Sequence, residues 1–280
     1  MSQSKPRLAR APAGWRDPWL LASLPLLLFL IIPLASLFLS ASPAELIANL
    51  SRPQVFQAIR ISLLTTLAST AAIVTFGTPL AYALARGRAP LQRLLDALIE
   101  LPIVLPPAVA GVALLLTFGR QGLIGGALDA IGLSLAFTPL AVIMAQTFVA
   151  APFYIRSAVL GFEAVPAELE LAAAIDGATS WQLFRHVTVP LAWASLLSGA
   201  VLSWARALGE FGATILFAGN FLGRTQTMPL AIYIGFELDL DVALTLATIL
   251  VLVSFAVLWL VRGALSRPVG RPRAGTSRPN

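Results

Sequence analysis

The 280-residue chain is 58% hydrophobic and only 11% charged, and its mean hydropathy is +0.85. A soluble domain of this length does not require so much apolar surface, so the composition predicts an all-α integral membrane protein. Because the chain has no cysteine, it has no disulfide framework and no thiolate metal or redox site, and we expect neither a metal nor a cofactor. The net charge of +6 does not indicate a nucleic-acid partner, because the arginines stand at the ends of apolar runs, where they orient membrane spans.

The chain opens with a basic segment and a long apolar run. Residues 1–17 are predicted to form a disordered cytoplasmic tail. The run Pro18–Ala41 amounts to about 35 Å of helix at 1.5 Å per residue, enough to span a bilayer. It exceeds the usual signal-peptide core of about 7–15 residues, although the small residues 40–42 would suit cleavage. We interpret it as the first span of a membrane domain, residues 18–262, with a cleaved signal peptide as the alternative. The segment 42–57 is polar and punctuated by proline.

Prolines mark the third of the predicted spans. The second span covers Ala58–Leu84, and the third, Ala97–Phe118, contains Pro102, Pro106 and Pro107. Three prolines predict a bend or a break. The freed carbonyls need partners inside a membrane, so this span is expected to pack within protein or to line a wet path. A kinked helix that only packs is the simpler alternative, and it is compatible with the first.

A glycine-rich loop, Gly119–Ala136, leads to the fourth predicted span, Phe137–Val159, which we expect to be interrupted near Pro152. This span delivers the chain to Glu163–Pro190, the longest polar interval between apolar runs. The polar interval is predicted to lie outside the membrane.

The first part of the polar interval has the pattern of a helix. Pro166 suits a first helical position, and Glu168 and Glu170 fall in the first turns, where carboxylates meet the positive end of the helix dipole. Alanines follow, and Gly177 can end the helix.

A second short helix is predicted over Ser180–Val187, with Thr179 or Ser180 as its cap and Pro190 as its stop. The sole histidine, His186, is interpreted as a solvated or interface residue. Two short helices with a small-residue surface, held between spans, favour a docking element. An amphipathic hairpin that lies on the membrane without a partner is the alternative.

The fifth predicted span, Leu191–Phe217, carries two ionisable residues. Arg206 and Glu210 are four residues apart and share one helix face. Ionisable groups at that depth are functional candidates by default. A mutually satisfied structural pair is the alternative, and both can hold. Gly209 and Gly212 flank the glutamate and are expected to loosen the helix there.

The last segments comprise a short apolar piece and a final span. Met228–Phe236 is too short to cross a bilayer, and we expect a re-entrant or surface helix on the outer side. The final span is predicted at Val242–Val261. Residues 263–280 are predicted to form a second disordered basic cytoplasmic tail.

The distribution of basic residues predicts an orientation. With the amino terminus inside and six spans, fourteen Lys and Arg residues lie inside, whereas Arg52, Arg60, Arg120 and Arg224 lie outside. Cytoplasmic segments of membrane proteins carry the excess of basic residues. Both termini and the polar interval are therefore predicted to be cytoplasmic.

The polar interval also resembles a known motif. Ala172, Ala173, Gly177 and, after nine residues, Val187-x-Val189-Pro190 resemble the EAA loop of ABC-importer permeases, which docks in a cleft on a cytoplasmic ATPase subunit. The leading glutamate of that motif would fall at Leu171, and this chain has Glu170 one residue earlier. The resemblance implies ATPase-coupling roles for Glu170, Ala172, Ala173, Asp176, Gly177, Val187 and Pro190.

Two further runs are similar to one branch of these permeases. The residues 101–115, LPIVLPPAVAGVALL, and the run from Arg206 to Glu237 look like molybdate and tungstate permeases, and sulfate permeases are the closest competitor. The resemblance implies a type I ABC-importer architecture with six transmembrane helices in the inner membrane: a homodimeric channel for anion import, two ATPase subunits and an extracytoplasmic binding protein. The candidates for pathway or gating roles are Pro106, Pro107, Arg206, Gly209, Glu210 and Gly212.

Other classes of protein remain as alternatives. The chain lacks the phosphate-binding G-x-x-x-x-G-K-[ST] motif, so we expect the partner rather than this chain to bind and hydrolyse ATP. A secondary transporter requires titratable groups near the bilayer centre, and only Arg206 and Glu210 qualify. An intramembrane enzyme requires a nucleophile and a base, and His186 lies in the polar interval.

Overall fold

The computed structural model describes residues 17–40, 42–87 and 90–265, and all regular structure within them is helical. The elements are α1 Asp17–Ser40, α2 Pro43–Leu50, α3 Pro53–Arg86, α4 Pro90–Val104, α5 Pro107–Phe118, α6 Gly125–Ala130, α7 Pro139–Glu163, α8 Ala167–Ile175, α9 Ser180–Leu183, the π-helical turn η2 Phe184–Thr188, α10 Val189–Leu208, α11 Gly212–Phe217, α12 Met228–Leu238 and α13 Leu240–Leu265. The two predicted tails lie outside the described residues, except that α1 starts at Asp17 and α13 continues to Leu265.

Five described helices are long and apolar enough to cross a membrane, or six if a bent pair counts as one span. The five segments are Trp19–Ser40, Pro53–Arg86, Pro139–Glu163, Ser180–Leu208 and Leu240–Trp259. The sixth is the pair α4–α5, in the place of the predicted third span. This span is therefore not a single straight helix, because its two halves are bent by 115°.

The prolines explain the break between α4 and α5. Leu105 still donates its N–H to the Leu101 carbonyl at 3.0 Å, but Pro106 has no N–H to continue the ladder. Pro107 then stands at the start of α5, where a missing N–H costs nothing. The predicted break is confirmed at Pro106, whereas Pro102 stays inside α4.

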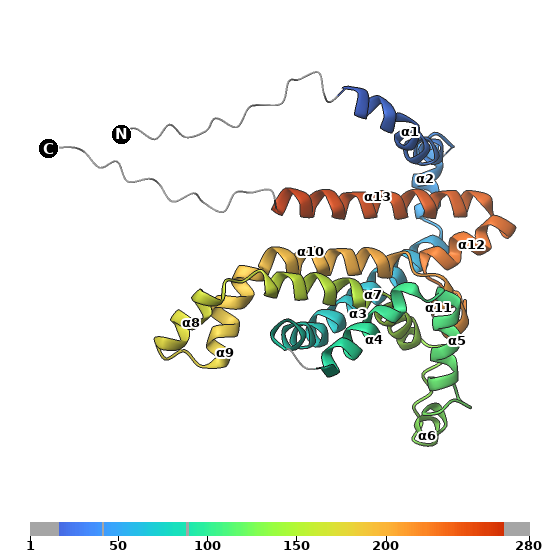
Figure 1. Ribbon diagram of the computed structural model, residues 1–280. Helices are drawn as coiled ribbons and strands as arrows, with labels where there is room; N and C mark the ends of the chain where they lie inside the picture. The colour runs from blue at the N-terminus through green and yellow to red at the C-terminus, as the bar shows by residue number, and fades with distance from the viewer. Residues whose placement is uncertain (1–16, 41, 88–89, 266–280) are drawn as a thin grey trace.

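Helix α7 is the centre of the fold, with α3 and α10 packed along it (Figure 1). Small residues allow α7 and α10 to approach closely. A Cβ atom on Gly199 would lie 2.7 Å from the Cβ of Ser157, and Ser203 donates a hydrogen bond to the Ala150 carbonyl at 3.0 Å. The spacing of Gly199 and Ser203 on α10 is thus the basis of this helix contact.

Three predicted element boundaries were wrong. Helix α7 runs through Pro152 without interruption, because this proline is buried within the central contact of α7 with α3 and α10. The second span, α3, starts at Pro53 and not at the predicted Ala58, and α2 precedes it; both helices begin with a proline at a first-turn position. The predicted glycine-rich loop contains the short helix α6.

The fifth span also differs from its prediction. Pro190 does not stop the preceding helix: α9 continues through η2 into α10, and Pro190 lies in the first turn of α10. The Val189 N–H donates to the Phe184 carbonyl, five residues back. This wider turn relieves the clash of a proline ring with the carbonyl four residues before it. The helix then ends at Leu208, well before the predicted end at Phe217.

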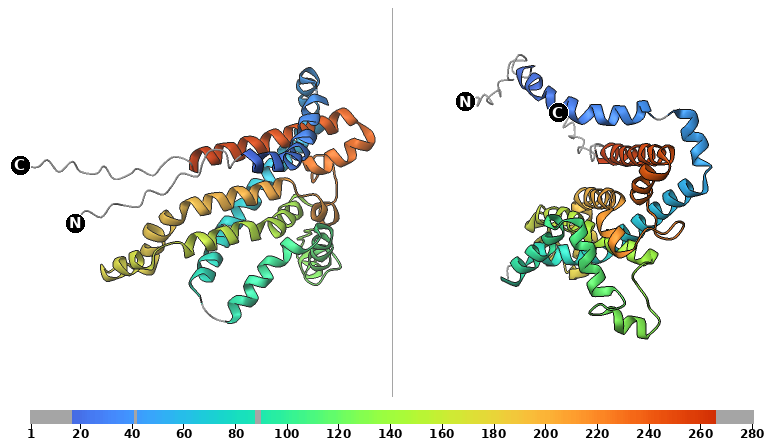
Figure 2. Two further views of the ribbon diagram at one scale, coloured as in Figure 1. Left: turned by 45° about the horizontal axis from the view of Figure 1, so that its top comes forward. Right: turned by 90° about the vertical axis from the view of Figure 1, so that its right-hand side faces the viewer.

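The elements divide the molecule into two ends. Helices α8 and α9 lie at one end with the last turn of α3 and the last turns of α13, and we call this the hairpin end (Figure 1). Helices α6, α11 and α12 lie at the opposite end. Helix α1 runs beside α13 at the periphery, and none of its apolar window is buried (Figure 2).

Candidate functional site

The segment 164–188, which contains α8, α9 and η2, forms a helical hairpin at the hairpin end. Its first helix closes on Gly177, whose φ of +88° lies in the left-handed region that favours glycine. The Gly177 N–H donates to the Ala174 carbonyl at 3.1 Å, and the Ala178 N–H donates to the Ala173 carbonyl at 3.0 Å. These two bonds form a Schellman turn, which satisfies the last carbonyls of α8. The predicted helix end at Gly177 is confirmed.

The second helix of the hairpin starts at a capping box. The Thr179 side chain accepts from the Gln182 N–H at 3.3 Å, and the Gln182 side chain accepts from the Thr179 N–H at 2.8 Å. Of the two predicted caps, the structure therefore uses Thr179. Pro166 is the N-cap of α8, one position before the predicted one.

The surface of the hairpin exposes large apolar side chains. Leu171 is 63% exposed, Ile175 85% and Trp181 65%, and Asp176 and Gly177 are also exposed. Several large apolar side chains exposed on one hairpin favour a protein-binding surface. Two other predicted coupling residues lie on the same helix: Ala172 is exposed and Ala173 half-buried.

Glu170 has a different environment from its neighbour Leu171. Its Oε1 atom accepts a hydrogen bond from the hydroxyl of Thr188 at 2.8 Å and forms an ion pair with Arg86 at the end of α3. Thr188 is fully buried, and the Arg86 guanidinium lies 5.8 Å from the ring centre of Tyr82. The carboxylate at position 170 therefore faces the base of the hairpin, whereas position 171 faces outward.

An aromatic cluster joins the hairpin to the membrane helices. Phe184 of η2 lies 4.9 Å from Tyr82 of α3, 6.2 Å from Phe162 of α7 and 5.6 Å from Trp181 of α9, all between ring centres. Aromatic rings prefer edge-to-face or offset arrangements, so these contacts favour one orientation of the Phe184 ring. Val187, beside this cluster, is half-buried. Together with Glu170, the cluster joins the hairpin to α3 and α7.

The second group of candidates lies at the break between α10 and α11. Glu210 is 1% exposed, and its Oε1 atom accepts a hydrogen bond from the Ala213 N–H at 2.8 Å. Its Oε2 atom lies 2.9 Å from Nη1 of Arg206 on the preceding helix. The predicted pair is therefore present, and the helix is broken between Gly209 and Gly212, as the two glycines indicate.

The two broken helix pairs meet each other. A Cβ atom on Gly212 would lie 2.9 Å from the Cβ of Pro107, and one on Gly111 would lie 2.8 Å from the Ala213 carbonyl oxygen. The structure thus brings Pro107, at the start of α5, against the start of α11. Pro106, exposed at the N-cap of α5, is adjacent.

Sequence reasoning missed a polar seam on α3. Ser62, Thr65, Thr66 and Ser69 are buried, and their spacing places them on one helix face. The Ser62 hydroxyl accepts a hydrogen bond from the Met228 N–H at 2.7 Å, which anchors the start of α12. The helical spacing of these four small polar residues is a signal that could have found the seam.

A sequence profile described as "binding-protein-dependent transport system inner membrane component" matches residues 73–269. The molybdenum transport system permease protein ModB of Mycobacterium tuberculosis is 42% identical over 231 residues, which cover 82% of this chain and 88% of that protein. The sulfate transport system permease protein CysW of Synechococcus elongatus is 38% identical over 206 residues, which cover 72% of each chain.

Among solved structures, a bacterial ABC transporter that imports the acidic polysaccharide alginate aligns with a TM-score of 0.69. The alignment covers 91% of this chain and 98% of that chain, at 17% sequence identity. The arrangement of helices described above is therefore the fold of ABC-transporter permeases.

Proposed function

The chain belongs to the family of binding-protein-dependent transport system inner membrane components, and we propose that it is the permease subunit of an ATP-driven importer for molybdate and tungstate. The observation that carries the coupling to ATP is the 164–188 hairpin, which exposes Leu171, Ile175 and Trp181 and is fixed to α3 and α7. The molybdate specificity rests on the 42% identical relative named as a molybdenum permease.

In this proposal the hairpin docks in a cleft of a cytoplasmic ATPase subunit. The exposed residues of α8, together with Asp176 and Gly177, contact the ATPase, and Val187 and Pro190 hold the base of the hairpin. Two copies of the chain form the channel, each with its own ATPase, and an extracytoplasmic binding protein delivers the anion. The proposed orientation, with both termini in the cytoplasm, is supported by the distribution of basic residues along the sequence.

Transport proceeds by alternating access. A bare dianion cannot cross hydrocarbon, because its desolvation costs tens of kcal/mol. A polar path must therefore open to one side at a time. ATP-driven closure of the partner pushes the hairpin, and the contacts of Glu170 and Phe184 pass this push to α3 and α7. We assign the gating movement to the junction of α5 with α11, where both spans are broken near Pro107 and Gly212.

Buried charge supports a role for the same junction. Glu210 and Arg206 lie beside the break between α10 and α11, and the Glu210 side chain is buried whereas that of Arg206 is 28% exposed. Removal of Arg206 would leave the buried carboxylate of Glu210 without its ion-pair partner, which costs stability at this break. We therefore assign these two residues to gating and packing rather than to recognition of the anion.

Sulfate import is the second candidate, because a sulfate permease is 38% identical to the chain. It ranks below molybdate because both the identity and the coverage are lower.

Affinity purification of the tagged chain, expressed with its neighbouring genes, tests the proposed class. We expect an ATPase to co-purify in equal amount and ATP hydrolysis to rise when the loaded binding protein is added. A stably folded chain that retains no ATPase would contradict the proposal and favour a secondary transporter.

A further inference from the structure

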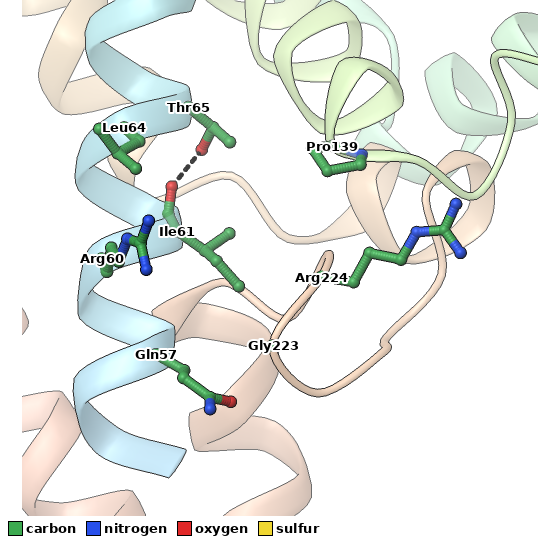
Figure 3. A pocket seen from close by; sticks show the side chains of 8 residues that line it. All are labelled: Gln57, Arg60, Ile61, Leu64, Thr65, Pro139, Gly223 and Arg224. Carbon is green, nitrogen blue, oxygen red and sulfur yellow. Dashed lines mark hydrogen bonds between the residues drawn. The ribbon is translucent and has the colours of Figure 1, made fainter. Parts of the chain in front are cut away.

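A pocket of about 240 Å³ opens at the end of the molecule opposite the hairpin. It lies between α3, the start of α7 and the loop 218–227 that leads to α12 (Figure 3). Its lining residues are Gln57, Arg60, Ile61, Leu64, Thr65, Pro139, Gly223 and Arg224. This pocket is separate from both the hairpin and the junction of α5 with α11.

The charges around this pocket are unbalanced. Arg52 forms an ion pair with Asp239 at 2.7 Å, and Arg120 lies 3.9 Å from Asp129. The other two arginines predicted for the outer side, Arg60 and Arg224, form no ion pair with a carboxylate of the described residues.

Both of these unpaired arginines line the pocket, and both are exposed. The lining of the pocket thus carries two arginines and no carboxylate. A cleft lined by charge of one sign, with walls of low dielectric, focuses the field and raises the local concentration of counter-ions.

The loop that carries Arg224 is tied by hydrogen bonds and packs against α3. Its neighbour Thr225 is fully buried, and the Thr225 hydroxyl accepts from the Phe221 N–H at 3.0 Å and donates to the Gly219 carbonyl at 3.3 Å. Gly223 has a φ of +72°, and a Cβ atom there would lie 3.0 Å from Oε1 of Gln57. The loop is thus closely fitted against α3, and Arg224 projects from a fixed backbone.

We propose that this pocket is a receiving site for a tetrahedral oxyanion at the outer face. Guanidinium groups match the geometry of such anions through paired N–H donors, and the side chain of Gln57 adds an amide donor. The apolar wall of Ile61, Leu64 and Pro139 lowers the local dielectric and strengthens the attraction.

Figure 3 shows Arg60 on α3 and Arg224 on the loop at opposite sides of the pocket. An exposed arginine changes rotamer within nanoseconds, so either side chain can turn toward an anion that enters. The site is open to water and is expected to bind weakly, as a transfer site must if it is to release its ligand.

The same chemistry fits two sources of oxyanion: the dissolved dianion of the proposed function and the phosphate of a lipid headgroup. The inference rests on the proposed function only for the physiological anion and for the assignment of this end to the outer face. Binding by the full-length chain requires neither an ATPase nor a binding protein, so it is tested separately from transport.

The test measures equilibrium binding of radiolabelled molybdate and sulfate to the full-length chain in phosphatidylcholine nanodiscs. We expect the double variant Arg60→Gln/Arg224→Gln to weaken binding of both anions about tenfold or more. The matched control, Arg52→Gln/Arg120→Gln, removes the same charge from arginines that already have carboxylate partners, and we expect it to change binding less than twofold. Equal losses in the two double variants would overturn the proposal, because the pocket would then have no special role.

A second arm distinguishes the source of the anion. Native mass spectrometry of the chain from nanodiscs that contain phosphatidylglycerol reports retained lipid. If the dissolved dianion is the ligand, molybdate binding persists in these nanodiscs and lipid retention is the same in the native chain and the Arg60→Gln/Arg224→Gln variant. If a headgroup is the ligand, only the native chain retains the lipid, and molybdate binding is lost. A native chain that binds neither anion nor lipid better than the double variant would overturn the oxyanion site altogether.

Discussion

Gly177 and Glu170 determine the shape and the attachment of the hairpin at the scale of single residues. The sequence indicates that Gly177 ends a helix, and the structure shows that the reason is its left-handed backbone. The role of Glu170 could not be predicted, because its partners Arg86 and Thr188 lie 84 and 18 residues away along the chain. Local pattern thus predicts helix ends, whereas side-chain partners depend on packing between distant segments.

Replacement of Gly177 by leucine tests the docking surface. No atom lies within 4 Å of a Cβ placed there, so the variant should cost only the backbone strain of a left-handed residue, about 1–2 kcal/mol. The new side chain would nevertheless separate the hairpin from its ATPase. We expect loss of both transport and stimulated ATP hydrolysis, with an unchanged size-exclusion profile.

Gly132 offers a matched control for this variant. It also has a positive φ, +81°, and open space around its Cβ position, but it follows α6 at the opposite end. Gly132→Leu should retain transport. Normal transport by Gly177→Leu would show that the hairpin is not the docking surface.

At the scale of whole elements, three prolines show that the sequence alone does not predict whether a proline ends a helix. Pro106 ends a helix, Pro152 lies inside one, and Pro190 lies in a first turn after a π-helical turn. Each of these prolines removes one backbone N–H donor, so the residue type predicts local strain but not whether the helix ends there. Buried packing around Pro152 keeps α7 continuous, whereas Pro106 and Pro107 together prevent continuation. The sequence therefore predicted the helices but misplaced several of their ends.

The contact of Glu170 with α3 can be tested by Glu170→Gln. The variant keeps an acceptor for Thr188 but loses the ion pair with Arg86, so the hairpin should be held less firmly. We expect ATP hydrolysis to persist while transport per ATP falls severalfold. Trypsin cleavage after the exposed Arg185 should also become faster.

The neighbouring variant Leu171→Glu serves as the control. Leu171 is 63% exposed, so a carboxylate there remains in contact with water. Transport should be retained. Equal loss of coupling in both variants would mean that charge at the surface, not attachment to α3, controls the hairpin.

At the scale of the whole molecule, hydropathy and charge predict the arrangement of spans better than they predict the ends of individual helices. Hydropathy predicted the spans, and the same fold is found in an alginate importer at 17% sequence identity. The prolines predicted the break between α4 and α5, but its angle of 115° and the peripheral place of α1 could not be predicted, because both depend on neighbours that the sequence does not identify. The contact between α5 and α11 could not be predicted either, although Pro107 and Gly212, which form it, were candidates for pathway or gating roles.

Orientation is testable with single cysteines, since the native chain has none. Ser180→Cys, in the hairpin, should react with an impermeant maleimide only in inside-out vesicles. Ser51→Cys and Ala127→Cys, both exposed at the opposite end, should react only from the outside of intact cells. The arrangement of basic residues is the physical reason for this expectation. Labelling of Ser180→Cys from outside would remove the hairpin from any cytoplasmic ATPase.

The substrate of the assembled transporter is the last expectation. Molybdate and tungstate are tetrahedral dianions of nearly equal size, whereas sulfate is smaller. A dry ring of hydrogen-bond donors in the binding protein can measure this difference, but a wet path through the permease cannot, and a tight site there would slow release. In proteoliposomes with permease, ATPase and binding protein, uptake of radiolabelled molybdate should therefore be inhibited by tungstate and little affected by excess sulfate.

Arg206→Ala should lower the rate of uptake without changing this order, because Arg206 pairs with buried Glu210. Strong competition by sulfate with none by tungstate would assign the chain to sulfate import, and a changed order in Arg206→Ala would place selectivity in the permease itself.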